Sequence, residues 1–127
     1  MNETVRQWID KADGDFDAAK QLIAGCRPNF DAICYHAQQC IEKLMKAVLI
    51  YRGVHPPRTH NLVWLNKLLE PVCSEWTVPS DDLEFLTRAA GAFRYPGASA
   101  EHEDAAEAMK ICTRLRELLL KILYLNE

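Results

Sequence analysis

Apolar residues recur at spacings of three and four along most of the chain, which is the pattern of helices with one buried face. The first such pattern covers residues 4–24 and ends at Gly25, a residue type common after helices. Its predicted buried positions are Val5, Trp8, Ile9, Ala12, Phe16, Ala19, Leu22 and Ile23. We place four aspartates on the opposite, solvent-exposed side of this helix: Asp10, Asp13, Asp15 and Asp17.

Four further segments continue the helical pattern. They cover residues 30–52, 61–70, about 79–94 and 100–125. The candidate N-terminal caps are Asn29, then Thr59 or Asn61, and Ser99. No segment alternates apolar and polar residues between hairpin turns, as strands do. The sequence therefore predicts an all-α fold, with residues 1–127 forming a single domain. It is an up-and-down bundle of about five helices, three long and two short.

The end of the last helix is apolar on more than one face. Its apolar residues are Leu118, Leu119, Leu120, Ile122, Leu123 and Leu125. A small bundle needs only one such face for its own core, and a second apolar face is typical of self-association. We therefore expect a homodimer.

Composition excludes several classes of protein. The chain is 49% hydrophobic and 26% charged, with a net charge of −3, so a surface that coats nucleic acid broadly is not expected. It has no apolar run of the length of a membrane span and no signal-peptide core, which predicts a cytosolic protein. Five cysteines without a Cys-x-x-Cys pair predict free thiols.

Positive charge is concentrated locally despite the negative total. Residues 43–69 contain five Lys or Arg and no Asp or Glu. Just before and within this stretch, Gln39, Lys43 and Lys46 stack along one side of the second helix. Glu42 lies beside them and can pair with Lys46. By spacing alone, a solvated face with one ion pair is the commoner outcome, and an anion site is the alternative.

Two loops carry further candidate residues. Pro56 and Pro57 stiffen the first loop, in which Arg58 and His60 precede a helix start that can hold phosphate. The alternative is that His60 bonds near the cap and the arginines only aid solubility. In the second loop, Arg94 could contact phosphate while Tyr95 stacks on a base. Alternatively, Arg94 bonds the last helical carbonyls and Tyr95 packs on the core.

Metal and nucleophile chemistry find little support. His36 and Cys40 share one helix face, and His102 lies among acidic residues, but neither group gives a four-ligand pattern. No Ser, Cys or Thr stands in a recognisable nucleophile motif. We therefore predict no metal, no cofactor and no catalytic residue.

Three segments together resemble the HEPN family, the nucleotide-binding domain of higher eukaryotes and prokaryotes. Residues 35–47 look like the family's Gln-x-x-Glu-Lys-x-x-Lys-Ala core. Thr59-His60-Asn61-Leu62, followed by Leu65, resembles its Thr-His-Asp-Leu-x-x-Leu segment, and Arg94-Tyr95-Pro96 resembles its Arg-Tyr-Pro element. The three occur in the family's order, and the resemblance covers nearly the whole chain.

The resemblance implies an all-α bundle, usually dimeric, that is encoded or fused with a small nucleotidyltransferase in a two-component system, often of toxin–antitoxin type. It implies that Lys43, Lys46 and Arg94 contact phosphate. It also implies base or sugar hydrogen bonding for Gln39, and phosphate contact or orientation for His60. With the two loop candidates, the expected nucleotide-binding residues are Gln39, Lys43, Lys46, Arg58, His60, Arg94 and Tyr95.

Many relatives are ribonucleases that use Arg-x(4–6)-His, and this chain departs from that motif. Seven residues separate Arg52 from His60, and seven separate Arg94 from His102. The leading hypothesis is therefore a non-catalytic module that holds a nucleotide or a nucleotidylated partner. One alternative is a ribonuclease toxin in which His60 acts with Arg58 or Arg94 on RNA. The other is an interaction bundle without any ligand.

Overall fold

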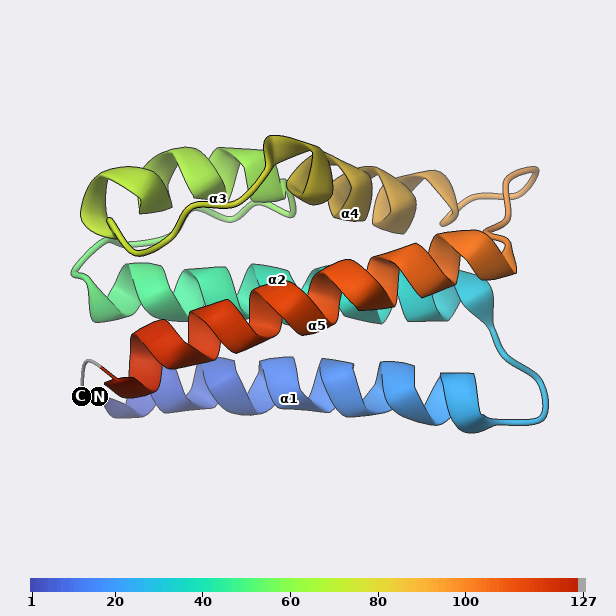
Figure 1. Cartoon of the computed structure of the whole chain (residues 1–127), viewed down its shortest axis with the longest axis horizontal. Helices are drawn as coiled ribbons and strands as arrows, with labels where there is room; N and C mark the ends of the chain where they lie inside the picture. Colours follow the sequence, from blue (N-terminus) through green and yellow to red (C-terminus); the bar gives the residue numbers. More distant parts are fainter. Residues whose placement is uncertain (126–127) are drawn as a thin grey trace.

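The computed structural model describes residues 1–125 and confirms the predicted helices. Three are long and two are short, a single 3₁₀ turn follows the third, and no strand occurs among the described residues (Figure 1). Their bounds are α1 Glu3–Ala24, α2 Phe30–Tyr51, α3 Leu62–Leu69, η1 Glu70–Val72, α4 Ser80–Ala92 and α5 His102–Leu125.

Helix α2 is the centre of the bundle. It packs against every other α-helix, most extensively against α1 and α5. In Figure 1, α1 lies below α2, the short helices α3 and α4 lie above it, and α5 crosses in front. Because α2 is surrounded in this way, it buries most of its residues, including four polar ones: Gln38, Gln39, Glu42 and Lys46. The helix that carries the candidate site is therefore also the core helix.

Asparagines cap three of the helices. The side chain of Asn2 accepts a hydrogen bond from Val5 N at 2.9 Å, and that of Asn29 accepts from Ala32 N at 3.0 Å. For α3 the cap is Asn61 rather than Thr59, with its oxygen 2.9 Å from Val63 N. These oxygens satisfy backbone N–H groups that have no partner within the helix.

The predicted cap of the last helix is wrong. Helix α5 begins at His102, not after Ser99. The N–H of Ala100 instead donates to the Asp31 carboxylate at 2.6 Å, and the N–H of Glu101 donates to Asp104 at 2.9 Å. Asp31 thus holds the residues before α5 against the start of α2, and Asp104 supplies the side-chain acceptor.

Helix α2 ends because of a glycine and an arginine. Gly53 has a φ of +83°, a backbone conformation that L-residues rarely adopt. Arg52 then binds the end of η1 and the segment after it, donating to Val72 O at 2.8 Å and to Glu75 at 2.7 Å. These contacts join the end of α2 to η1 and to the residues that follow it.

The cysteines are free thiols, as predicted, and only Cys26 is exposed. Burial raises the pKa of the Cys34 thiol to about 11. None of the helices within residues 1–125 is both long and apolar enough to cross a membrane.

Candidate functional site

A buried carboxylate, that of Glu42, organises the polar residues in the middle of α2. Its Oε1 accepts hydrogen bonds from Gln38 at 3.1 Å and from Gln39 at 3.3 Å. Its Oε2 lies 3.0 Å from the Lys46 ammonium, which confirms the i, i+4 pair anticipated from spacing. The Glu42 side chain is only 4% exposed, so its charge is compensated almost entirely by protein groups.

His60 is fixed to this carboxylate at the surface. Its Nδ1 lies 2.9 Å from Glu42 Oε1, and its backbone oxygen accepts a hydrogen bond from Gln38 at 2.8 Å. The imidazole is nevertheless 73% exposed. A carboxylate that binds Nδ1 orients the ring and leaves Nε2 to exchange a proton with solvent or a ligand.

A second buried carboxylate corrects the sequence analysis. Asp15, which we expected on the exposed side of the first helix, is 8% exposed. Its two oxygens bind His36 Nδ1 at 2.8 Å and Lys43 Nζ at 2.6 Å. This clamp joins α1 to α2 and offsets the cost of burying the aspartate.

A pocket lined by polar, basic and apolar residues, here called the Trp8 pocket, lies beside Glu42 and its partner Lys46. It has a volume of about 440 Å³, and none of the described residues that line it is Asp or Glu. The Lys46 ammonium is 5.5 Å from the centre of the Trp8 ring, so a cation and an aromatic face are held together inside it. The lining residues are Asn2, Thr4, Trp8, Lys46, Ile50, His55, Pro56, Pro57 and Arg58.

A second pocket, here called the Arg94 pocket, lies where α4 meets the start of α2. Its volume is about 380 Å³. The Arg94 guanidinium is 5.7 Å from the centre of the Tyr35 ring. The acidic lining residue, Asp31, is already bound to the N–H of Ala100. The lining residues are Asn29, Asp31, Ala32, Tyr35, Ala90, Phe93 and Arg94.

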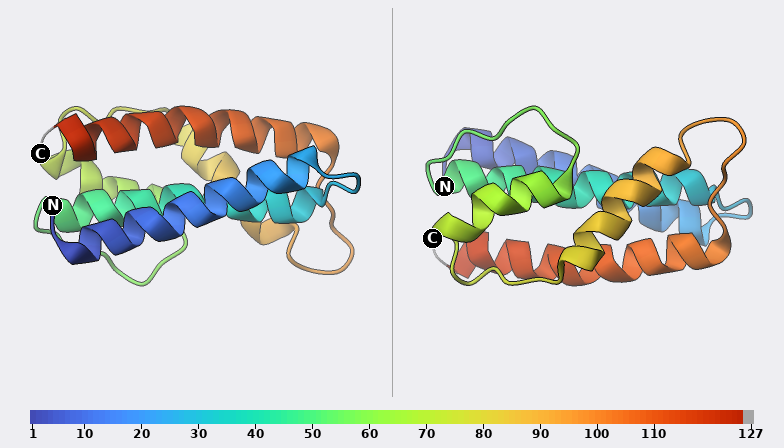
Figure 2. Two further views of the ribbon diagram at one scale, coloured as in Figure 1. Left: turned by 90° about the horizontal axis from the view of Figure 1, so that it is seen from below. Right: turned by 90° about the horizontal axis from the view of Figure 1, so that it is seen from above.

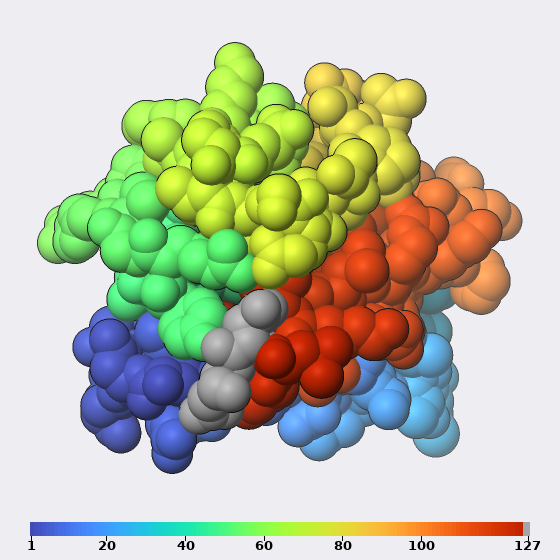
Figure 3. Space-filling view, turned by 60° about the vertical axis from the view of Figure 1, so that its left-hand side comes forward, coloured from blue at the N-terminus to red at the C-terminus, as the bar shows by residue number. Residues whose placement is uncertain are grey.

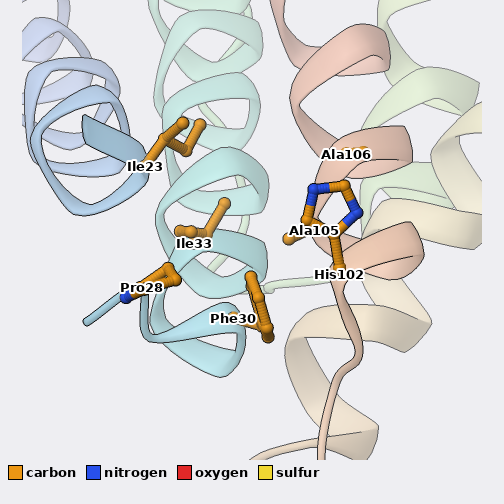
Figure 4. Close-up of a pocket in the computed structure, with 7 residues that line it drawn as sticks. All are labelled: Ile23, Pro28, Phe30, Ile33, His102, Ala105 and Ala106. Carbon is orange, nitrogen blue, oxygen red and sulfur yellow. The ribbon is translucent and has the colours of Figure 1, made fainter. Parts of the chain in front are cut away.

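A third pocket is apolar and lies at the opposite end of α1 from Trp8. Figure 4 shows its lining side chains converging from the end of α1, the start of α2 and the start of α5. It is smaller, about 160 Å³, and its described lining contains no Lys or Arg; the ring of His102 meets Phe30 edge to face. The lining residues are Ile23, Pro28, Phe30, Ile33, His102, Ala105 and Ala106.

The structure divides the seven expected residues into groups. The Glu42 carboxylate gathers Gln39, Lys46 and His60. Arg58 lines the same pocket as Lys46, whereas Lys43 belongs to the Asp15 clamp. Arg94 lies in its own pocket, and Tyr95 is 67% exposed without lining that pocket.

Sequence reasoning missed four residues at these sites. Gln38 stood inside the quoted motif but carried no spacing signal of its own. Trp8 was assigned to the core, although its ring lines a pocket. Asp15 and His36 face each other across two helices, 21 positions apart, which no local pattern indicates. Within residues 1–125, no three His, Cys, Asp or Glu residues are grouped to hold a metal ion.

Comparison with known proteins connects this geometry to a family. The model of the HEPN domain matches residues 5–123. TT1696 from Thermus thermophilus has a similar fold, with a TM-score of 0.74 and 21% identity over 95% of this chain and 99% of that one. ST0689, an archaeal HEPN homologue, gives a TM-score of 0.67 and 24% identity over 94% and 97% of the two chains.

A shorter match concerns a named protein of Methanocaldococcus jannaschii, “Putative toxin MJ1304”. The two sequences are 40% identical over 47 residues. The aligned segment is 37% of this chain and 30% of that protein, so less than a third of the relative is covered.

Proposed function

Because this chain belongs to the HEPN domain family, we propose that it is the nucleotide-binding member of a toxin–antitoxin-type pair whose other member is a small nucleotidyltransferase. The similarity of 47 residues to a protein named as a toxin supports the toxin–antitoxin part. The proposal that the chain binds a nucleotide rests on the Trp8 pocket.

The observation that carries the proposal is the chemistry of that pocket. A nucleotide needs a flat apolar surface for its base and positive charge for its phosphates. The Trp8 ring supplies the surface, while Arg58, at the exposed edge of a proline-stiffened loop, supplies positive charge. Among the described lining residues there is no carboxylate to repel phosphate. Lys46 contributes less, since Glu42 already balances its charge.

Calorimetric titration of ATP and GTP, with and without Mg²⁺, tests this proposal. We expect binding that Arg58→Glu weakens about tenfold, because a phosphate contact becomes a repulsion. Lys110→Glu makes the same change of charge on the exposed side of α5 and is the matched control. Absence of binding at millimolar nucleotide, or equal losses in the two variants, contradicts a nucleotide site in the Trp8 pocket.

The partner is tested separately. A nucleotidyltransferase encoded next to this chain, when co-expressed with it, is expected to co-elute in size-exclusion chromatography as a complex of defined mass. Two separate peaks at micromolar concentrations of both proteins argue against the pair, whatever the nucleotide titration gives.

A ribonuclease is the second candidate, and the Glu42–His60 contact favours it. In this reaction His60 Nε2 takes the proton from a ribose 2′-hydroxyl as its oxygen attacks the neighbouring phosphorus, and the 5′-oxygen of the next nucleotide leaves with a proton from water. An arginine stabilises the charge that develops on the phosphate. Arg58, two positions before His60, is the nearest arginine in the chain. Glu42 acts as a positioning residue because it holds Nδ1. The Arg-x(4–6)-His spacing of other family members is missing, so the arrangement differs from theirs.

Expression in cells together with an RNA-cleavage assay tests the second candidate. Growth arrest and cleavage that His60→Ala abolishes support it, with His102→Ala, in the apolar pocket at the start of α5, as the control. Glu42→Gln is expected to lower kcat with little change in KM, because the ring loses the partner that orients it. Harmless expression, or cleavage that survives His60→Ala, excludes His60 as the base.

A further inference from the structure

We propose that the Arg94 pocket binds a free amino acid with an aromatic or large apolar side chain. The ligand binds as a zwitterion, with its carboxylate on Arg94 and its ammonium group on Asp31. Its side chain lies against Tyr35 and Phe93. The site is separate from the Trp8 pocket and goes beyond the proposed nucleotide-binding function.

The pocket brings together one cation and one anion that do not pair with each other. Within residues 1–125, the Arg94 guanidinium has no ion-pair partner, and it lies over the Tyr35 ring. The Asp31 carboxylate accepts a hydrogen bond through Oδ1 from the N–H of Ala100 at 2.6 Å. Its other oxygen, Oδ2, has no hydrogen-bond partner among the described residues. Because both groups line one pocket and neither satisfies the other, both are available to a ligand that carries two opposite charges.

The balance of charge in the pocket selects the class of ligand. Asp31 and Arg94 are the charged residues of the described lining, so their charges cancel. A phosphate is attracted by Arg94 but repelled by Asp31, whereas no carboxylate opposes it in the described lining of the Trp8 pocket. A zwitterion without net charge satisfies both groups at once, and the guanidinium can bind its carboxylate through two parallel N–H donors.

Two aromatic residues give the pocket a surface for the side chain of the ligand. Tyr35 is 39% exposed, and its ring meets that of His36 edge to face at 5.4 Å. The Arg94 guanidinium lies 5.7 Å from the centre of the Tyr35 ring, which holds the cation beside the aromatic surface. Phe93 is half-buried, and two alanines complete the apolar lining. An aromatic or large aliphatic side chain therefore buries apolar area against these residues.

The size of the pocket limits the ligand to a small molecule. Figure 2 shows from two directions that the C-terminal end of α4 reaches the start of α2, and the pocket lies between them. Its volume of about 380 Å³ is near the lower end of small-molecule sites, which span roughly 300–1,000 Å³. Since Arg94 is exposed to solvent, the ion pairs are screened, and we expect a dissociation constant on the order of 1 mM.

The test is an NMR titration of the full chain with L-phenylalanine and two analogues that each lack one charge. The analogue 3-phenylpropionate keeps the carboxylate, and phenethylamine keeps the ammonium group. We expect each to bind about three- to tenfold more weakly than phenylalanine, because one ion pair is lost. The amide signals that shift with phenylalanine should include those of Tyr35, Phe93 and Arg94. Glycine, which has both charges but no side chain, should also bind more weakly.

Two substitutions distinguish the two charges. Arg94→Gln is expected to weaken phenylalanine and 3-phenylpropionate and to leave phenethylamine unchanged. Asp31→Asn keeps an oxygen that can accept from the Ala100 N–H, and it is expected to weaken phenylalanine and phenethylamine but not 3-phenylpropionate. Lys110→Gln, on the exposed side of α5, is the control and should change none of them. Circular dichroism verifies that each variant is folded.

Four outcomes overturn the inference. The first is equal affinity for phenylalanine and both single-charge analogues, and the second is no shift at the pocket at ~10 mM phenylalanine, well above the expected dissociation constant. The third is AMP that binds more tightly than phenylalanine and depends on Arg94, which identifies a phosphate site. The fourth is glycylphenylalanine that binds as tightly as phenylalanine, which identifies a peptide ligand. ATP binding that depends on Arg58 is independent of all four, so the proposed function and this inference can fail separately.

Discussion

The negative charge of the Glu42 carboxylate is balanced by groups of the protein itself. It stands directly before the acid-free stretch 43–69, and it binds Lys46 and His60 while accepting hydrogen bonds from two glutamines. At the level of single residues, Lys46, which the family motif assigns to phosphate, therefore already forms an ion pair with Glu42. The spacing of Glu42 and Lys46 indicated this pair, but their burial follows from the position of α2 among the other helices.

Replacing Glu42 by glutamine tests this arrangement. Glu42→Gln keeps the shape of the side chain but leaves the buried Lys46 ammonium without a counter-charge. We expect the free energy of unfolding, measured in urea, to fall by about 3 kcal/mol. Adding Lys46→Met should restore part of the loss, because the uncompensated charge is then gone. Asp82→Asn, which breaks the more exposed pair with Arg114, is the control and should cost under about 1 kcal/mol.

At the scale of elements, apolar periodicity predicts the helices well, and local chemistry predicts their ends less well. Gly25 and Gly53 mark true helix ends, whereas the Ser99 cap fails because Asp31, 69 positions from Ala100, holds the preceding backbone. The predicted exposure of Asp15 is wrong for a similar reason, because its partner Lys43 lies 28 positions away in the sequence. Contacts between distant elements leave no periodic trace, so the sequence predicts the helices and the motif residues but not the pairing between them.

The contact between the end of α2 and the segment after η1 should depend on pH. The backbone N–H of Glu75 and the Arg52 guanidinium lower the pKa of the Glu75 carboxyl to about 2. A pKa lowered by folding adds stability above the ordinary value of 4.5, and this stability is lost as the pH falls toward 2.

Melting curves of the wild type and Glu75→Gln should therefore differ by about one or two degrees at pH 7 and converge near pH 2. Glu84→Gln on the exposed side of α4 is the control. A difference that persists unchanged at pH 2 rules out the charged contact as its cause.

At the scale of the whole molecule, α5 leaves two leucines exposed on one side. Leu119, Ile122 and Leu123 face the core, whereas Leu118 and Leu125, seven positions apart, are exposed on one side of the helix. The C-terminal part of α5 lies with the start of α1 and the loop 52–61 at one end of the bundle (Figure 3). The predicted homodimer stays a prediction, and this side of α5 is its candidate surface.

Light scattering behind size-exclusion chromatography checks the dimer. We expect twice the 14.5 kDa mass of one chain, and a shift to the single-chain mass for Leu118→Glu. Trp64→Glu changes a somewhat more exposed apolar residue on α3 and should keep the dimer. A wild-type protein of single-chain mass at millimolar concentration refutes self-association.

The internal pairing of Lys43 and Lys46 has a consequence for counterions. A polyanion that binds a protein releases condensed cations in proportion to the phosphates that become neutralised, and log K falls with log[salt] by about 0.7 per phosphate on a single strand. If only Arg58 and Arg94 are left to neutralise phosphate, the slope is about −1.4, whereas four active cations give about −2.8. A short single-stranded RNA, the substrate of the ribonuclease candidate, distinguishes these two values when titrated between low and moderate salt. The shallow slope would mean that the strand is held mainly by stacking, with an affinity that falls about sevenfold, rather than about fiftyfold, for a fourfold rise in salt.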